Sequence, residues 1–262
     1  MRRDFNRRNI ILGSAALGSL LFLASHSEAA THDFLAPTRL IDNDHPQIIS
    51  LAQRIAPADL PDIDKTKRIF QFVRDDIKFG FGPRFYDHRA SEIAEMQLGY
   101  CNTKGTLIVA LLRASGIAAR QVFVDIDANI LTGIVDPGTP FVDHSYVEIL
   151  LGNKWLATDA YIVDTPLFIA AQKRLAAENR LVGYGIHSLG TYIFDEANPS
   201  FSQFVAGGQP SLTSRNYGIH ADVEAFYEAT PETWNRLRFI TRRAFPVFAM
   251  LANRNAETLR TS

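Results

Sequence analysis

The sequence predicts an α+β fold in which a central buried helix packs on an antiparallel sheet. Residues 101–115 predict the helix, because apolar side chains cover most of its circumference and Gly116 follows as a left-handed stop. Two extended runs, 141–151 and 154–161, flank the pair Gly152-Asn153, which is typical of a two-residue hairpin turn. A tight turn joins strands that pair antiparallel, so the hairpin and the helix together indicate the mixed class.

Further elements surround this core. The spacing of apolar residues and the capping and breaking residues predict them. They are helices over 48–55, from Asp62 or Asp64 to the glycines at 80 and 82, over 90–96 and over 167–181, a strand over 121–126, and a terminal helix from Pro231 that Pro246 kinks or breaks.

The composition is that of an ordinary globular protein. Of the 262 residues, 47% are hydrophobic and 21% charged, which excludes a collagen-like, disordered or disulfide-framework chain. The formal net charge of -1 lacks the basic excess of a nucleic-acid-binding protein, so we expect no nucleic-acid partner.

Residues 1–29 have the three parts of a secretory signal and are set apart from the fold. Arginine pairs at 2–3 and 7–8 precede a moderately apolar run over 10–24, and small residues end it. This pattern resembles the twin-arginine (Tat) export signal of bacteria. We therefore expect a signal peptide and a periplasmic or extracellular protein, with an uncleaved anchor as the alternative.

The remaining chain is expected to form two parts of one folded unit. Residues 30–165 would be the core with its N-terminal helices, and 166–262 a mainly helical extension packed on that core. The sequence has no internal repeat, low-complexity tract or long linker that would separate them.

Cys101 is the only cysteine, which is unusual for an exported chain, where cysteines commonly pair. It falls in the first turn of the central helix, where free backbone N–H groups and the helix dipole favour a thiolate. The same N–H groups are placed to hold the oxyanion formed when a carbonyl is attacked. Gly99 would allow a sharp turn just before it. The alternative is a buried, inert cysteine.

His144 and Asp159 are the candidates for base and orienting group. If Gly152-Asn153 is a two-residue turn, Tyr146 faces Asp159, and His144 is its diagonal neighbour on the same sheet face. Asp143 would point to the opposite face. The alternative is a structural histidine beside a solvated aspartate.

These residues carry a resemblance to a known family. The motifs are Gly99-Tyr100-Cys101 at the helix start, the run from Ala110 to Arg120 at its end, the strand motif His144-Ser145-Tyr146-Val147-Glu148, then Trp155 and Asp159. In this order and spacing they resemble the core of the transglutaminase-like superfamily, over roughly residues 60–165. The resemblance implies a papain-like fold in which the helix carrying Cys101 packs on the sheet carrying His144 and Asp159, and a catalytic triad of these three.

The chain departs from the family pattern at three places. Tyr146 stands where tryptophan is common, Ala118 where proline is common, and Asn102-Thr103 where an acidic residue often follows the cysteine. These changes affect the surroundings of the substrate and leave the acyl acceptor open.

The resemblance implies thiol-dependent acyl transfer on amides through a thioester. We expect hydrolysis by a cysteine peptidase or amidase acting on a protein, peptide or cell-wall amide. A protein-crosslinking transglutaminase, an acetyltransferase of the arylamine type and a non-catalytic binding or scaffold module remain as alternatives.

No cofactor or metal is expected. Asp125, Asp127 and Asn129 imitate the start of a calcium loop, but Ile130 occupies the glycine position. The arginines and aromatic residues over 234–243 would suit a membrane surface, although a helix docked on the domain is favoured.

Overall fold

The structure is a computed structural model that describes residues 34–204 and 213–262, and the side chains of 213–214 and 234–243 are not described. The expected signal peptide over 1–29 and the side chains considered for membrane contact lie outside the described residues. Within the described part, no helix is long and apolar enough to span a bilayer.

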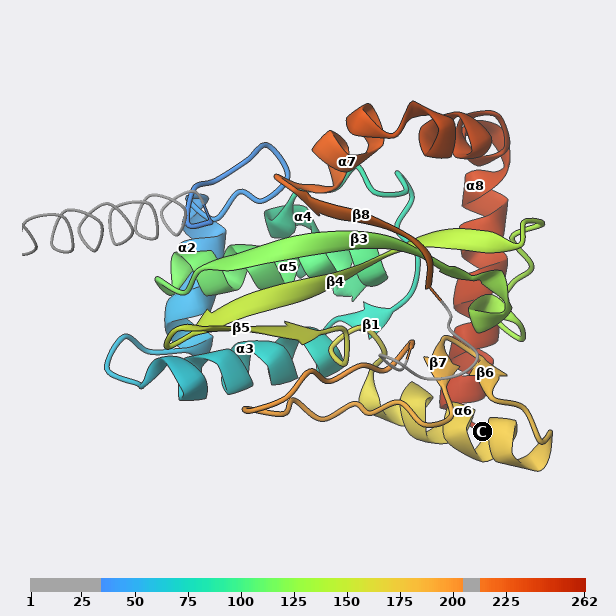
Figure 1. Ribbon diagram of the computed structural model, residues 1–262, viewed down its shortest axis with the longest axis horizontal. Helices are drawn as coiled ribbons and strands as arrows, with labels where there is room; N and C mark the ends of the chain where they lie inside the picture. Colours follow the sequence, from blue (N-terminus) through green and yellow to red (C-terminus); the bar gives the residue numbers. More distant parts are fainter. Residues whose placement is uncertain (1–33, 205–212) are drawn as a thin grey trace, which may run out of the picture.

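The centre of the fold is a four-stranded antiparallel sheet in the order β5-β4-β3-β8 (Figure 1). Its strands are β3 (Ala119–Asp127), β4 (Phe141–Leu151), β5 (Lys154–Thr158) and β8 (Thr213–His220). The two-residue turn is confirmed, because Leu151 pairs with Lys154 and the same register continues to Val147 opposite Thr158.

Helix α5 (Cys101–Ala114) packs against this sheet and is buried along almost its whole length, from Cys101 to Arg113. Its apolar residues face in all directions because other helices cover the side away from the sheet. These are α2 (Pro46–Ile55), α3 (Asp62–Asp75) and α4 (Ala90–Met96). The expected α+β class, with a central helix on an antiparallel sheet, is therefore confirmed.

The C-terminal part wraps around one end of the sheet (Figure 1). It contains α6 (Thr165–Ala177), the short strands β6 (Val182–Gly183) and β7 (Ile186–His187), α7 (Val223–Ala229) and α8 (Pro231–Arg260). Helix α8 packs on α6, and its last turn is fixed by Arg260, which donates to both carboxylate oxygens of the buried Asp164 at 2.8 Å.

Several predicted boundaries differ from the structure. Helix α3 ends at Asp75, since Lys78–Phe79 forms strand β1 beside β2 (Leu98–Gly99). Helix α6 ends four residues before the predicted position. Strand β8 was not predicted. It belongs to the C-terminal extension, which was expected to be mainly helical, and it forms an edge strand of the main sheet.

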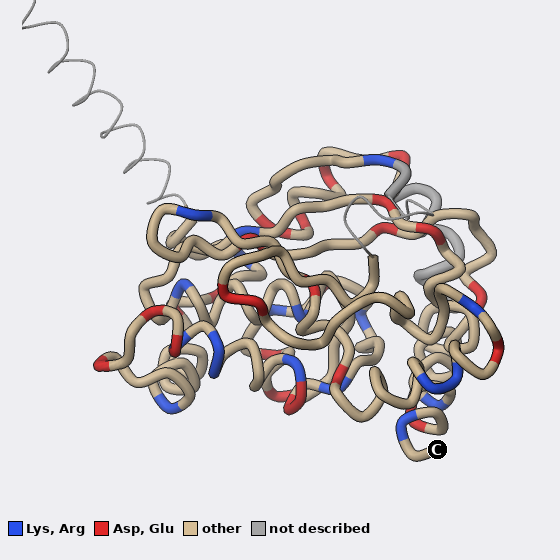
Figure 2. The backbone as a smooth tube through the Cα atoms, turned by 60° about the horizontal axis from the view of Figure 1, so that its bottom comes forward, with Lys and Arg blue, Asp and Glu red and all other residues tan. Residues whose placement is uncertain are grey.

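Pro246 does not break α8, which continues on both sides of it. Figure 1 shows the first and last parts of this helix running in different directions. Charged residues of both signs are interspersed along the described chain (Figure 2).

Candidate active site

Cys101 is the first residue of α5 and follows the short strand β2. The turn is held by Thr103, whose hydroxyl oxygen accepts a hydrogen bond from the Tyr100 backbone N–H at 3.0 Å. A side chain at Gly99 would place its Cβ 2.9 Å from both Thr103 Oγ1 and Lys104 Cγ. A larger residue at position 99 would therefore displace one of these two side chains.

The sulfur of Cys101 is held by a short chain of polar groups. Its Sγ–H donates weakly to Asn102 Oδ1 at 3.8 Å, and Asn102 Nδ2 donates to Asp143 Oδ2 at 2.8 Å. Tyr227 donates its hydroxyl to the same Asp143 oxygen at 2.7 Å. Because a carboxylate only accepts, Asp143 fixes the Asn102 amide with its NH₂ toward the carboxylate and its oxygen toward the thiol.

Burial raises the pKa of the Cys101 thiol, and the negative charge of Asp143 raises it further. The backbone N–H groups of Ser145 and Asn102 act in the opposite direction. The sequence had indicated a thiolate favoured by the helix N-terminus. In the structure only 7% of the Cys101 surface is exposed, and the loss of water outweighs those N–H groups. The balance of these effects favours the neutral thiol over the thiolate.

His144 and Asp159 are brought together by the hairpin. His144 lies on β4, Asp159 follows directly after β5, and His144 Nε2 is 3.1 Å from Asp159 Oδ2. The backbone N–H of Ser202 donates to the other oxygen of Asp159 and holds the carboxylate in place. Both side chains are almost fully buried, at 1% and 0% exposure.

The hydrogen bond to Asp159 defines the tautomer of His144. A carboxylate oxygen accepts, so the proton of the neutral ring lies on Nε2 and the lone pair on Nδ1. Within the described residues, Nδ1 has no hydrogen-bond partner although it is buried. The ring therefore presents an unoccupied basic nitrogen.

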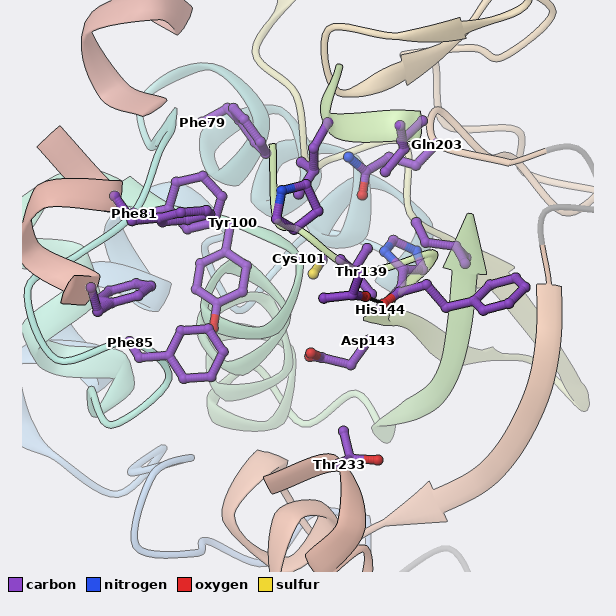
Figure 3. Close-up of a pocket in the computed structure, with 18 of the residues that line it drawn as sticks. Phe79, Phe81, Phe85, Tyr100, Cys101, Thr139, Asp143, His144, Gln203 and Thr233 are labelled. Atoms are coloured by element: carbon purple, nitrogen blue, oxygen red, sulfur yellow. Dashed lines mark hydrogen bonds between the residues drawn. The ribbon is translucent and has the colours of Figure 1, made fainter. Parts of the chain in front are cut away.

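One cavity contains Cys101, Asp143 and His144 in its lining (Figure 3). Figure 3 shows the sulfur of Cys101 at the centre of this cavity, with His144 on one side and the ring of Tyr100 on the other. The three predicted residues therefore lie together: Cys101 and His144 line the cavity, and Asp159 is hydrogen-bonded to Nε2 of His144.

Sequence reasoning missed the hydrogen-bonded group of Asn102, Asp143 and Tyr227, in which Asn102 contacts the sulfur. It placed Asp143 on the sheet face opposite His144, and the hydrogen bond of Asp143 to Asn102 puts its carboxylate against α5. The signal was present in the alternation of β4, because neighbouring strand residues point to opposite sheet faces and α5 packs on one of these faces. Tyr227 comes from α7, far away in sequence.

Residues 49–160 match the model of the transglutaminase-like superfamily. Among solved structures, the chain is similar to a protein from Cytophaga hutchinsonii described as a "putative cysteine protease", with 20% sequence identity and a TM-score of 0.40. The similarity covers 49% of this chain and 40% of that one. No curated protein matches the chain.

Proposed function

This chain contains a transglutaminase-like superfamily domain over residues 49–160, and from that premise we propose that it hydrolyses amide bonds through a thioester on Cys101. At the level of the family, the match supports a thiol-dependent enzyme that acts on amides. Hydrolysis and the individual roles of the residues are our proposal.

The observation that carries the proposal is the free Nδ1 of His144. Among the described residues this buried nitrogen has no hydrogen-bond partner, its ring belongs to the lining of the cavity that holds the thiol, and Asp159 is bonded to the other ring nitrogen. This is the arrangement that a general base for a thiol requires. A structural histidine would be expected to use both ring nitrogens in hydrogen bonds.

In the proposed reaction, Nδ1 takes the proton from Cys101 as Sγ attacks the carbonyl carbon of the amide. The backbone N–H groups in the first turn of α5 stabilise the oxyanion. His144 returns the proton to the leaving nitrogen, the C–N bond breaks, and an acyl thioester remains on Cys101. Water then attacks the thioester, with His144 accepting its proton, and the acid and the thiol are released.

A neutral resting thiol is compatible with this order of reaction steps. Proton transfer to His144 accompanies attack, so no stable thiolate is needed before substrate arrives. Substrate also displaces water from the cavity, which strengthens the interaction of the developing charges with the fixed N–H groups.

Burial of the sulfur favours water over a protein amine as acceptor. With 7% of Cys101 exposed and the acyl group occupying the cavity, a lysine side chain of a second protein would need a further path to the thioester. Water needs no such path. Crosslinking therefore remains the second candidate.

The test is amide hydrolysis by the wild-type protein and by Cys101→Ala, His144→Ala and Asp159→Asn variants. We expect activity that is abolished by the first two substitutions and reduced by at least about a hundredfold by the third. An amine acceptor such as glycine ethyl ester, added to the wild-type assay, distinguishes transfer from hydrolysis. A scaffold protein would show no activity and unchanged ligand binding in all variants.

A further inference from the structure

An aromatic wall forms one side of the cavity beside Cys101. It consists of Phe79, Phe81, Phe85, Tyr100, Phe245 and Phe248. The rings pack on one another, with Phe81 stacked on Tyr100 at 5.0 Å and Phe85 against Phe245 at 5.0 Å between ring centroids. A wall of mutually packed rings is preformed, so ligand binding does not have to order it.

Part of this wall comes from outside the residues that match the family. Phe245 and Phe248 lie on α8, beyond residue 160. Helix α8 also fixes the neighbouring segment, since Asn253 donates to the carbonyl of Phe81 at 3.0 Å and accepts from its N–H at 2.8 Å. Arg260 donates to the carbonyl of Phe79 at 3.1 Å. The C-terminal helix therefore shapes the cavity of this chain.

Phe85 shows how strongly the wall is constrained. Its φ of 55° lies in the left-handed region, which a bulky side chain rarely adopts. Its ring is stacked on Tyr100 and lies edge-on to Phe245, and these contacts hold it in position. Phe85 therefore has a fixed place in the aromatic wall.

The remaining lining of the cavity contains further apolar side chains beside the polar Thr139, Gln203 and Thr233. Its described residues include Ile126, Ile130, Leu131 and Val142. The charged side chain in the described lining is Asp143, whose negative charge repels an anionic group.

We propose that the acyl group transferred to Cys101 carries a large, uncharged apolar substituent that lies against this aromatic wall. Its source is either an aromatic amino-acid residue or a medium-chain fatty acyl group, which share this chemistry. The proposal rests on the proposed function, because it identifies the acyl donor of that reaction.

The test measures binding separately from turnover. Full-length Cys101→Ala protein is titrated by calorimetry with N-acetylphenylalaninamide, octanamide, N-acetylglycinamide and the α-amide of N-acetylglutamic acid. We expect at least one of the two apolar amides to bind about tenfold or more tightly than the glycine amide, because burial of a large apolar group stabilises the complex. The tighter of the two identifies the source.

A matched pair of substitutions on α8 locates the binding surface. Phe248→Ala should weaken binding of the preferred apolar amide at least threefold and leave the glycine amide unchanged. Met250→Ala, on the same helix but 61% exposed, should change neither. Circular dichroism shows whether each variant folds. If an α8 variant does not fold, the four-amide titration on the Cys101→Ala protein still tests the proposal.

Equal affinities for the glycine and apolar amides, or tightest binding of the glutamate derivative, would overturn the inference. The same four amides are assayed for hydrolysis by the wild-type protein. Apolar preference in binding without hydrolysis would refute the proposed function and leave the cavity assignment standing. Hydrolysis without an apolar preference in binding would refute the cavity assignment and leave the proposed function standing.

Discussion

Replacing Asp143 by asparagine should make Cys101 more reactive. The carboxylate is connected to the sulfur through Asn102, by contacts of 2.8 Å and 3.8 Å at the two ends of the amide. With ordinary amide dimensions, the charge lies within about 9 Å of Sγ. At an effective dielectric constant of about 20, it disfavours a thiolate by about 1.8 kcal/mol.

This energy corresponds to an increase of about 20-fold in the thiolate fraction of the Asp143→Asn variant at a fixed pH. The assay is the rate of alkylation by iodoacetamide between pH 6 and pH 9. Burial raises the pKa of Asp143 itself, and the difference between variant and wild type is expected wherever this carboxyl is ionised.

Two controls separate charge from structure. Asp143→Glu keeps the charge and should retain slow alkylation. Asp59→Asn removes an exposed carboxylate between α2 and α3 and should have no effect. An Asp143→Asn protein that folds normally but is alkylated no faster than wild type would refute the electrostatic reasoning.

Two further predictions concern the buried charges that hold the fold together. Arg260→Met should lower the free energy of unfolding by about 3–5 kcal/mol in urea titrations, because it leaves Asp164 buried and unpaired. Burial opposes ionisation of Asp164, but the ion pair with Arg260 outweighs burial and lowers the pKa of Asp164. In wild type the stabilisation by this ion pair is therefore present above the unfolded-state pKa of the carboxyl and is lost as pH falls through its folded-state pKa. Unfolding measured from pH 7 to pH 3 should show this acid loss in wild type and not in Arg260→Met; parallel curves would contradict it. Burial lowers the pKa of Lys104 to about 7 from 10.5, so between these values the unfolded chain binds a proton that the folded chain lacks, and stability should rise with pH. Lys104→Met should show a smaller rise than wild type between pH 7 and pH 9.5, and an equal rise would exclude this assignment.

The hairpin and the central helix could be predicted from sequence because local patterns determine them. The two-residue turn at Gly152-Asn153, with a φ of 59° at Gly152, sets the register of β4 and β5. That register brings Asp159 close to His144. The helix from Cys101 was recognisable because it is apolar on nearly all sides and Gly116 follows it, with a φ of 80°.

Other features depend on contacts between distant segments. Strand β8 contains Asn216 and Gly218, and its pairing with β3 has register shifts, so it lacks a regular strand pattern. The burial of the sulfur depends on the cavity walls, to which α8 contributes Phe245 and Phe248. No local pattern around Cys101 contains this information, which is why the direction of its pKa change could not be predicted.

The most direct test of the account is to detect the acyl group on the sulfur. Wild-type protein is mixed with an amide that turns over, quenched in acid within the first turnover, and the peptide containing Cys101 is analysed by mass spectrometry. We predict an adduct with the mass of the acyl group on Cys101, sensitive to hydroxylamine and missing in His144→Ala. Release of product with no adduct at any time, or the same adduct rate in His144→Ala, would contradict acyl transfer by this pair.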